Sequence, residues 1–276
     1  MKYTKITIRI NTQHKPPFFI GSALRGAFGY ALKKITCINP QYVCDGCFAK
    51  ESCLYYEFYE EKNSFHKYRF DFRLAMEQYE FDYYLFDDAT SKLPYIISSF
   101  IKMLKDYGLG KDGVKFDDFD IYINDILATN GSEIKLPKEY VKVFKIDEIY
   151  SDVYLELITP LRIKKENRFL RTDDIELSDI VNSTYQRQMR LLGRGFKKFP
   201  YQIKGEIVEK NLKYQELTRS SNRQKTLMNL GGIMGNMTIR NLNKESFEVL
   251  KLAELLAVGK QSVFGLGKIK INKKDL

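Results

Sequence analysis

The sequence predicts an α+β fold in which the element order β-α-β-β-α-β occurs twice along 276 residues. Three observations support it: segments of alternating apolar side chains, amphipathic helical segments between them, and a glycine-bearing turn before the last strand of each half. Apolar residues make up 44% of the chain, enough to build a core in each half. This order predicts tandem ferredoxin-like (RRM-like) domains at residues 1–148 and 149–276.

Apolar periodicity places the elements of the first half. Its strands are expected at Tyr3–Ile10, Phe65–Leu74, Tyr79–Phe86 and Phe116–Ile126. One helix is expected at Gly21–Ile35, where the small residues of GSALRGAFGYALKK allow close packing against a neighbour. The second helix, LPYIISSFIKMLKDYG, is expected to end at Gly108, because glycine readily takes the left-handed conformation that terminates helices.

The second half repeats the order, and the boundary between the halves is expected near residues 140–152. Its strands are expected at Val153–Ile158, Gly205–Tyr214, Ile233–Ile239 and Lys268–Ile271. A helix is expected at Asp173–Leu192, with Thr172 or Asp173 as N-cap because both side chains accept hydrogen bonds from backbone N–H groups. A second helix at Phe247–Ala257 precedes the turn GKQSVFGLG.

The charge balance favours a polyanionic partner. Lysine and arginine number 45 against 35 aspartate and glutamate, a net charge of +10, and clustered cations gain free energy by displacing counterions from phosphates. Charge alone does not separate a nucleic-acid-binding protein from an ordinary basic one. The N-terminus MKYTKITIRI alternates like a strand rather than a secretory signal, and no stretch approaches the ~20 apolar residues of a membrane span. We therefore expect a cytoplasmic protein.

All four cysteines, Cys37, Cys44, Cys47 and Cys53, lie in one loop of the first half, spaced C-x6-C-x2-C-x5-C. A C-x2-C pair presents two thiolates on one turn, and the flanking cysteines can complete a tetrahedral site. We expect a structural zinc there, without an open position for water or substrate, ahead of an iron–sulfur cluster on the same ligands. Disulfides, which a reducing compartment disfavours, and unpaired buried thiols are the alternatives.

The glycine-rich turn of the second half is a candidate for phosphate binding. Its candidate residues are Gly259, Lys260, Gln261, Ser262, Gly265 and Gly267. Glycines allow positive φ and close approach of another chain, and exposed N–H groups with a lysine can cradle phosphates. The spacing matches neither a P-loop nor a dinucleotide fingerprint, so no nucleotide cofactor is expected. RNA contact and a plain helix–strand turn are the two interpretations.

Two further basic groups are candidates for RNA contact. A spacing of three or four residues predicts that Arg187, Arg190 and Arg194 share one helix face, which Lys197 and Lys198 follow. Such a face suits the backbone of an RNA hairpin, where shape and phosphates dominate recognition. The second group is a polar, basic run for which a solvated hairpin end is the alternative: Arg219, Ser220, Arg223, Gln224 and Lys225.

Three segments, in order, resemble one protein family. FIGSALRGAFGYAL, followed by four cysteines and CLYYEFYE, is similar to the N-terminal part of the repeat-processing endoribonuclease branch of the RAMP superfamily of CRISPR proteins. LTRSSNRQKTLMNLGGIMGNMTI resembles the Arg-Ser…Arg-Gln segment and following strand of that branch, and LAVGKQSVFGLGKIKI resembles its glycine-rich loop. The three matches together span nearly the whole chain.

The resemblance implies a partner and a reaction. Members of this branch bind the repeat of a long CRISPR transcript and cut it once per repeat into guide RNAs. The 2′-OH beside the scissile phosphate attacks in line, without a metal, and leaves a 2′,3′-cyclic phosphate and a 5′-OH. The alternative is a non-catalytic RAMP subunit that binds guide RNA with other subunits of an effector complex, as a monomer or homodimer. A zinc-containing nucleic-acid-binding protein unrelated to CRISPR is a third possibility.

That reaction requires a base, an acid and cations for the charge of the phosphorane. Many relatives use a histidine on or just after the first helix, and this sequence departs from that pattern. His14 precedes the helix and is the candidate acid or base, with an exposed loop histidine as the alternative; His66 is a weaker candidate. Arg25 and Lys260 are candidate transition-state cations, although a structural arginine that pairs with a carboxylate or a helix carbonyl is the favoured explanation for Arg25.

Overall fold

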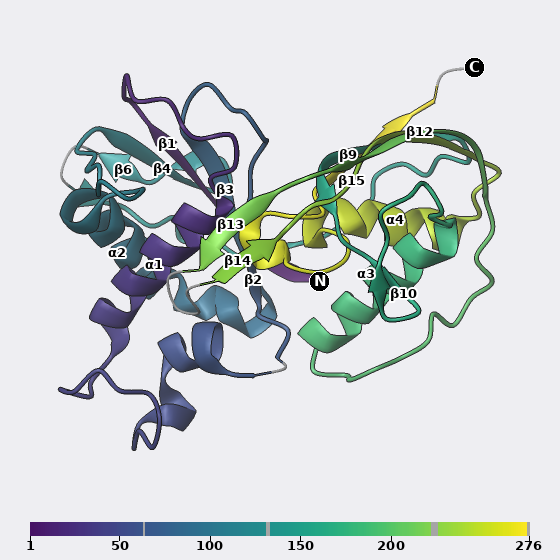
Figure 1. Ribbon diagram of the computed structural model, residues 1–276. Coiled ribbons are helices and arrows are strands. Elements are labelled where there is room, and N and C mark those ends of the chain that lie inside the picture. The colour runs from purple at the N-terminus through teal and green to yellow at the C-terminus, as the bar shows by residue number, and fades with distance from the viewer. Residues whose placement is uncertain (63, 131–132, 222–225, 275–276) are drawn as a thin grey trace. The chain divides into compact units, whose positions relative to one another are not determined.

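The computed structural model describes residues 1–62, 64–130, 133–221 and 226–274 (Figure 1). The chain divides into two compact units, Met1–Val143 and Phe144–Leu276. Within the described ranges, no helix combines the length and the apolar character needed to cross a bilayer.

The first unit is an antiparallel sheet with two helices packed against each other. Its path runs β2 (Tyr68–Asp71), β3 (Glu80–Phe86), β1 (Lys2–Ile10), β4 (Phe119–Ile123) and β5 (Ile126–Leu127), and β8 (Lys142–Val143) also pairs with β1. Helix α1 (Gly21–Thr36) packs against α2 (Leu93–Lys102) (Figure 1). Phe28 of α1 meets Phe100 of α2 and Tyr83 of β3, with ring centroids 4.5 and 5.0 Å apart. This aromatic cluster forms the core that the Tyr- and Phe-rich strands predict.

The small residues of α1 allow a close approach, as the sequence predicts. A Cβ atom on Gly29 would overlap the ring of Tyr59, so only glycine leaves room for this tyrosine. The Tyr59 hydroxyl donates a hydrogen bond to the Arg25 carbonyl at 2.9 Å. Glycine at this position therefore docks the segment after the cysteine loop onto α1.

The second unit repeats the arrangement. Its sheet is ordered β12 (Glu206–Gln215), β15 (Gly232–Arg240), β9 (Val153–Leu161) and β16 (Ile269–Lys273). Helices α3 (Leu177–Leu191) and α4 (Lys244–Leu256) pack against each other and bury one face of the sheet (Figure 1). Numbered along the chain within each unit, the four main strands take the spatial order 2-3-1-4 in both sheets.

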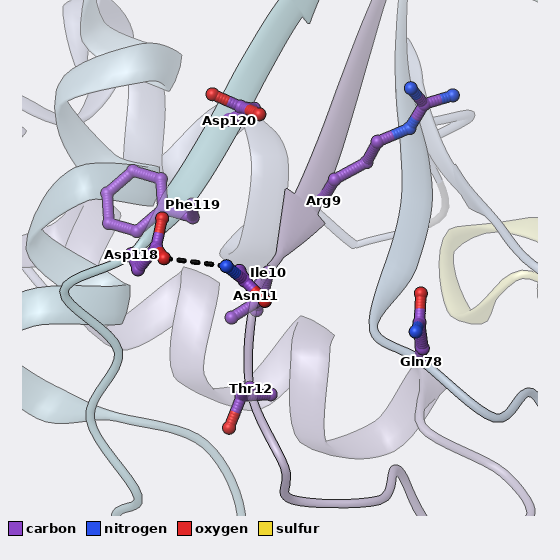
Figure 2. Close-up of a pocket in the computed structure, with 8 residues that line it drawn as sticks. All are labelled: Arg9, Ile10, Asn11, Thr12, Gln78, Asp118, Phe119 and Asp120. Atoms are coloured by element: carbon purple, nitrogen blue, oxygen red, sulfur yellow. Dashed lines mark hydrogen bonds between the residues drawn. The ribbon is translucent and has the colours of Figure 1, made fainter. Parts of the chain in front are cut away.

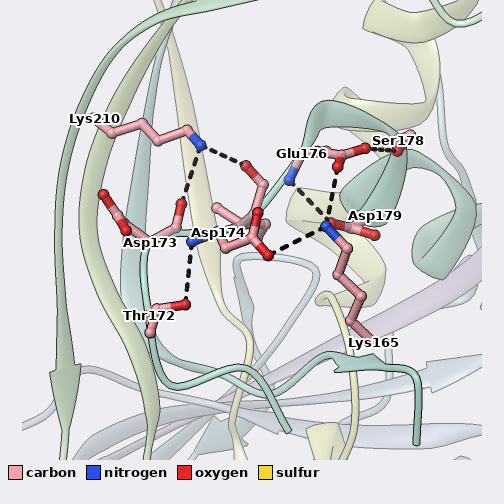
Figure 3. Close-up of polar contacts among 9 residues, drawn as sticks. Lys165, Thr172, Asp173, Asp174, Glu176, Ser178, Asp179 and Lys210 are labelled. Carbon is pink, nitrogen blue, oxygen red and sulfur yellow. Dashed lines mark hydrogen bonds and ion pairs between the residues drawn. The ribbon is translucent and has the colours of Figure 1, made fainter. Parts of the chain in front are cut away.

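Helix α3 begins four residues later than the sequence predicts, because its N-cap is Glu176 rather than Thr172 or Asp173. The Glu176 N–H donates to Asp179 Oδ2 at 2.9 Å within a capping box. Lys165 pairs with Glu176 at 3.0 Å and lowers the pKa of that carboxyl (Figure 3). Lys210 donates to the Asp173 carbonyl at 3.0 Å and holds the preceding segment outside the helix (Figure 3).

The end of α3 also differs from the expectation. Gly193, at φ 69°, takes the left-handed conformation, and the N–H of Arg194 bonds the Met189 carbonyl at 2.8 Å. Such a glycine termination closes the helix at Leu191. The prediction that Arg194 shares a helix face with Arg187 and Arg190 is therefore wrong, because Arg194 lies beyond the last turn.

Candidate nucleic-acid interface

The glycine-rich loop joins α4 to β16 and needs glycine at defined places. Gly259 and Gly267 have φ values of 81° and 76°. A Cβ on Gly259 would overlap the carbonyl of Arg162, and one on Gly267 would overlap the carbonyl of Val258. The packing of the backbone within the unit therefore requires glycine at both positions, whether or not another chain approaches the loop.

Two neighbouring segments, α3 and the end of β9 with the residue after it, hold this loop in one conformation. The Gly259 N–H donates to Ser183 Oγ of α3 at 3.0 Å, and the Lys260 N–H donates to the Arg162 carbonyl at 2.8 Å. The buried Thr159 hydroxyl donates to the Gly265 carbonyl at 2.8 Å. The loop is therefore preorganised, and a ligand would meet it without a large cost in ordering the backbone.

Only part of the loop reaches the surface. Gly265 and Gly267 are buried, and Ser262, at 2% exposure, has its carbonyl bonded to the Gly265 N–H at 2.9 Å. Lys260 is exposed and Gln261, at φ 65°, is partly exposed. The structure thus divides the predicted residues into an accessible edge, Gly259 to Gln261, and a supporting interior.

Positive charge converges on the accessible edge. Partial burial, and then the charges of Arg190 and Lys164, lower the pKa of Lys260 below its usual 10.5. Lys164 belongs to β10 (Lys164–Lys165), which pairs with β11 (Arg168–Phe169). Cations that repel one another in the free protein form a favourable place for an anion. Lys164 was not predicted as a site residue, although the basic run RIKK at residues 162–165, directly after a strand, indicates a possible phosphate contact.

The structure separates the predicted basic residues of α3. Arg190 is exposed and lies near Lys260, whereas Arg187 is only 6% exposed and packs in the interior. Lys197 and Lys198 are exposed on the segment after the helix. The side-chain carbonyl of Gln186 accepts from the Lys197 N–H at 3.3 Å, which ties that segment back to α3.

Arg219 has a structural partner at the loop. It lies on β13 (Thr218–Ser221), which forms a hairpin with β14 (Thr226–Asn229). Its guanidinium stacks over the Phe264 ring at 4.5 Å, so it links the hairpin to the glycine-rich loop. Arg223, Gln224 and Lys225 lie outside the described residues, as does the side chain of Ser220.

The catalytic candidates of the first unit have different surroundings. The Arg25 guanidinium stacks over the Tyr59 ring at 4.5 Å and interacts with Tyr68, which gives it a packing role whatever else it does. His14 is exposed in the loop after β1; its N–H donates to Thr12 Oγ1 at 3.2 Å and its ring meets Phe116 edge-on at 6.5 Å. His14 therefore has the solvent access that an acid or base needs.

The cysteine loop is organised by Asn39. The Cys37 thiol contacts the Asn39 carbonyl at 3.7 Å, and the Asn39 amide donates to the sulfur of Cys47 at 3.7 Å. All four thiols are free. Throughout the described chain, no three histidine, cysteine or acidic side chains are placed to share a metal ion.

Comparison with known proteins finds a matching family model for part of each unit. Residues 1–135 match an N-terminal domain family, AF_1859_N, and residues 155–269 match the family of the CRISPR-associated endoribonuclease Cas6. No curated protein sequence matches the chain.

Solved structures share the fold over the full length. A Cas6 product complex is 15% identical with a TM-score of 0.57, covering 99% of both chains. Cas6 of Thermus thermophilus is 14% identical with a TM-score of 0.52, covering 98% of both. A RAMP protein binding different RNA substrates is 10% identical with a TM-score of 0.53, covering 99% of this chain and 100% of the other.

Proposed function

We propose that this chain, whose residues 155–269 match the family of the CRISPR-associated endoribonuclease Cas6, binds the repeat of a precursor transcript and cleaves it into guide RNAs. The observation that carries this proposal is the group of cations around the preorganised loop of residues 259–267, inside the segment that matches Cas6. The matching strand order of the two sheets supports the interpretation of the units as tandem ferredoxin-like domains.

Binding follows from the electrostatics of the accessible edge. Lys260, Arg190 and Lys164 repel one another in the free protein, and a phosphate placed among them replaces that repulsion by attraction. Counterions released from the RNA add to the gain and make the affinity depend on salt. Lys197 and Lys198 are two further exposed cations of the same unit.

The proposed reaction uses the RNA as its own nucleophile. A base takes the 2′-OH proton, the 2′-oxygen bonds phosphorus, and the bond to the 5′-oxygen breaks as an acid protonates that oxygen. Lys260 would stabilise charge on the non-bridging oxygens, and His14 is the candidate acid or base. Arg25 is proposed as a second cation, although its stacking on Tyr59 also supports a purely structural role. No step in this scheme requires a metal.

We propose separately that the four thiols of the cysteine loop bind a structural zinc. Their clustering within residues 37–53, and an Asn39 amide that already donates to one sulfur, support the proposal. Binding would require the four sulfurs to converge to about 2.3 Å from the ion, a rearrangement of this loop. Elemental analysis of chelator-free protein tests it, and a zinc content near zero would contradict it.

The decisive experiment incubates the protein with its own repeat RNA in EDTA. We expect one cut per repeat and a 2′,3′-cyclic phosphate terminus, identified by mass spectrometry. A 2′-deoxy substitution before the cut should abolish cleavage and leave binding nearly intact. Tight binding without cleavage of the unmodified repeat would replace the enzyme by the RNA-binding subunit of an effector complex.

A further inference from the structure

A polar pocket of about 240 Å³ opens in the first unit where β1 ends. Arg9, Ile10, Asn11 and Thr12 form its centre, Asp118, Phe119 and Asp120 contribute one side, and Gln78 the other. Figure 2 shows the two aspartates on the β4 side of this segment and Gln78 on the opposite side. The register explains the assembly, because Arg9 pairs with Glu80 of β3 and with Asp120 of β4.

The side chains around the pocket are oriented by neighbours. Asn11 Nδ2 donates to Asp118 Oδ2 at 2.8 Å (Figure 2). Asp120 Oδ1 accepts from the Thr129 hydroxyl at 3.2 Å. The Arg9 guanidinium pairs with Glu80 at 3.0 Å and lies over the Tyr122 ring at 4.9 Å. Each aspartate keeps a second oxygen without a protein partner in the described part of the chain, so the pocket presents hydrogen-bond acceptors.

The charge of this pocket differs from that of the protein. In a chain of net charge +10, this pocket is lined by Asp118 and Asp120, and the arginine of its lining, Arg9, is already paired with Glu80. Carboxylates here would repel phosphate, so an RNA ligand gains at this place only through groups that donate hydrogen bonds. A divalent cation is a poorer match, since no described group of three acidic, histidine or cysteine side chains is placed to hold one.

We propose that this pocket binds an unpaired guanine of the RNA through its Watson–Crick edge. Guanine is the RNA base with two adjacent donors, N1–H and N2–H, which one carboxylate can accept together. The volume lies below the roughly 300–1,000 Å³ of pockets for drug-sized ligands, as suits one base. Single-stranded bases splayed from the backbone are the usual targets of sequence-specific RNA recognition.

The guanine pocket rests on the proposed RNA-binding function. Its first test uses nucleosides, which carry no phosphate, so that failure of the pocket can be distinguished from failure of RNA binding. The full chain is titrated with guanosine, inosine, adenosine, cytidine and uridine and followed by NMR of backbone and side-chain amides. We expect guanosine to shift Asn11 and Gln78 at the lowest concentration. Inosine, which lacks the N2 amine, should bind several-fold more weakly. Equal shifts with all five nucleosides, or shifts elsewhere, would overturn the proposal.

The second test uses single-stranded RNAs that differ only by one guanine-to-inosine replacement. At least one of the variants Asp118→Asn and Asp120→Asn should reduce the several-fold preference for guanine over inosine to nearly none, as expected for loss of a paired base contact. Asp112→Asn, at an exposed acid outside the pocket, is the matched control and should change nothing. Unchanged discrimination in both pocket variants, with thermal stability preserved, would exclude the pocket as a base reader. If no RNA binds the wild-type protein at low salt, the proposed function fails instead.

Discussion

The turns before the last main strand of each unit occupy the same place in the topology and differ in how they are held. In the first unit, Leu109 and Val114 bond each other through both backbone groups, at 2.8 and 2.9 Å, so the turn closes on itself. In the second, Thr159, Arg162 and Ser183 of other segments hold the glycine-rich loop. A closed turn needs nothing from its surroundings, whereas an anchored loop can present a fixed edge to a ligand.

The two turns also differ in charge. The first leads into Asp117, Asp118 and Asp120 and thus into the acceptor-rich pocket. The second carries Lys260 beside Arg190 and Lys164. The same strand order thus carries two different surfaces, one rich in hydrogen-bond acceptors and one rich in cations.

The largest expected effect is a difference in stability between a glycine-to-alanine substitution in the second turn and one in the first. Gly267→Ala places a Cβ against the Val258 carbonyl at positive φ, and we expect a loss of about 3 kcal/mol or more in unfolding free energy. Gly110→Ala, at φ 79° but with open space around its Cβ, should cost only about 1 kcal/mol. Urea unfolding of both variants measures the difference, and equal losses would contradict the distinction.

Charge at the second turn should affect RNA and not the fold. Lys260→Ala should slow repeat cleavage by roughly 10²-fold if the ammonium stabilises developing charge, and should reduce the salt slope of binding by about one unit. Lys111→Ala, in the corresponding turn of the first unit, is the control and should leave both unchanged. Single-turnover kinetics and salt titrations measure these quantities; equal behaviour of the two variants would remove Lys260 from the interface.

Two arginines three residues apart on α3 should give opposite results. Arg190→Ala should weaken RNA binding by about 1 kcal/mol with little change in stability, because its side chain is exposed near Lys260. Arg187→Ala should lower the unfolding free energy by about 1–3 kcal/mol, because its buried side chain leaves a cavity. Binding isotherms and denaturation curves on both proteins test this, and a stable Arg187→Ala protein with weak RNA binding would reverse the assignment.

The smallest expected effect is the pH dependence due to Lys260. Its folded-state pKa lies below the usual 10.5, so between these values the unfolded chain binds more protons and stability rises with pH. Below that window the charged ammonium is unfavourable in the fold. Lys260→Met should therefore be slightly more stable at neutral pH, by less than about 1 kcal/mol, and the advantage should vanish toward pH 10.5. If the stability difference between Lys260→Met and the unchanged protein grew with pH, the lowered pKa of Lys260 would be contradicted.

Local patterns in the sequence were sufficient to predict most of the elements and the family that residues 155–269 match. Alternating apolar residues located β1, β9 and β15, and the glycines marked the turn that carries Lys260. Net charge and three ordered motifs indicated an RNA-processing family, and residues 155–269, which contain the second motif and nearly all of the third, match the family model of the endoribonuclease Cas6. These features depend on neighbours along the chain, so one sequence contains them.

Tertiary contacts decided which candidates are available to a ligand. Helical spacing placed Arg187 and Arg190 near one another, but burial against the rest of the unit distinguishes them. Arg219 reads as a free surface cation until Phe264, 45 positions along the chain, comes under it at 4.5 Å. The guanine pocket had no sequence signal, because residues 9–12, 78 and 118–120 meet only when β3 and β4 pair on either side of β1. Long-range pairing brings such residues together, and no local pattern encodes it.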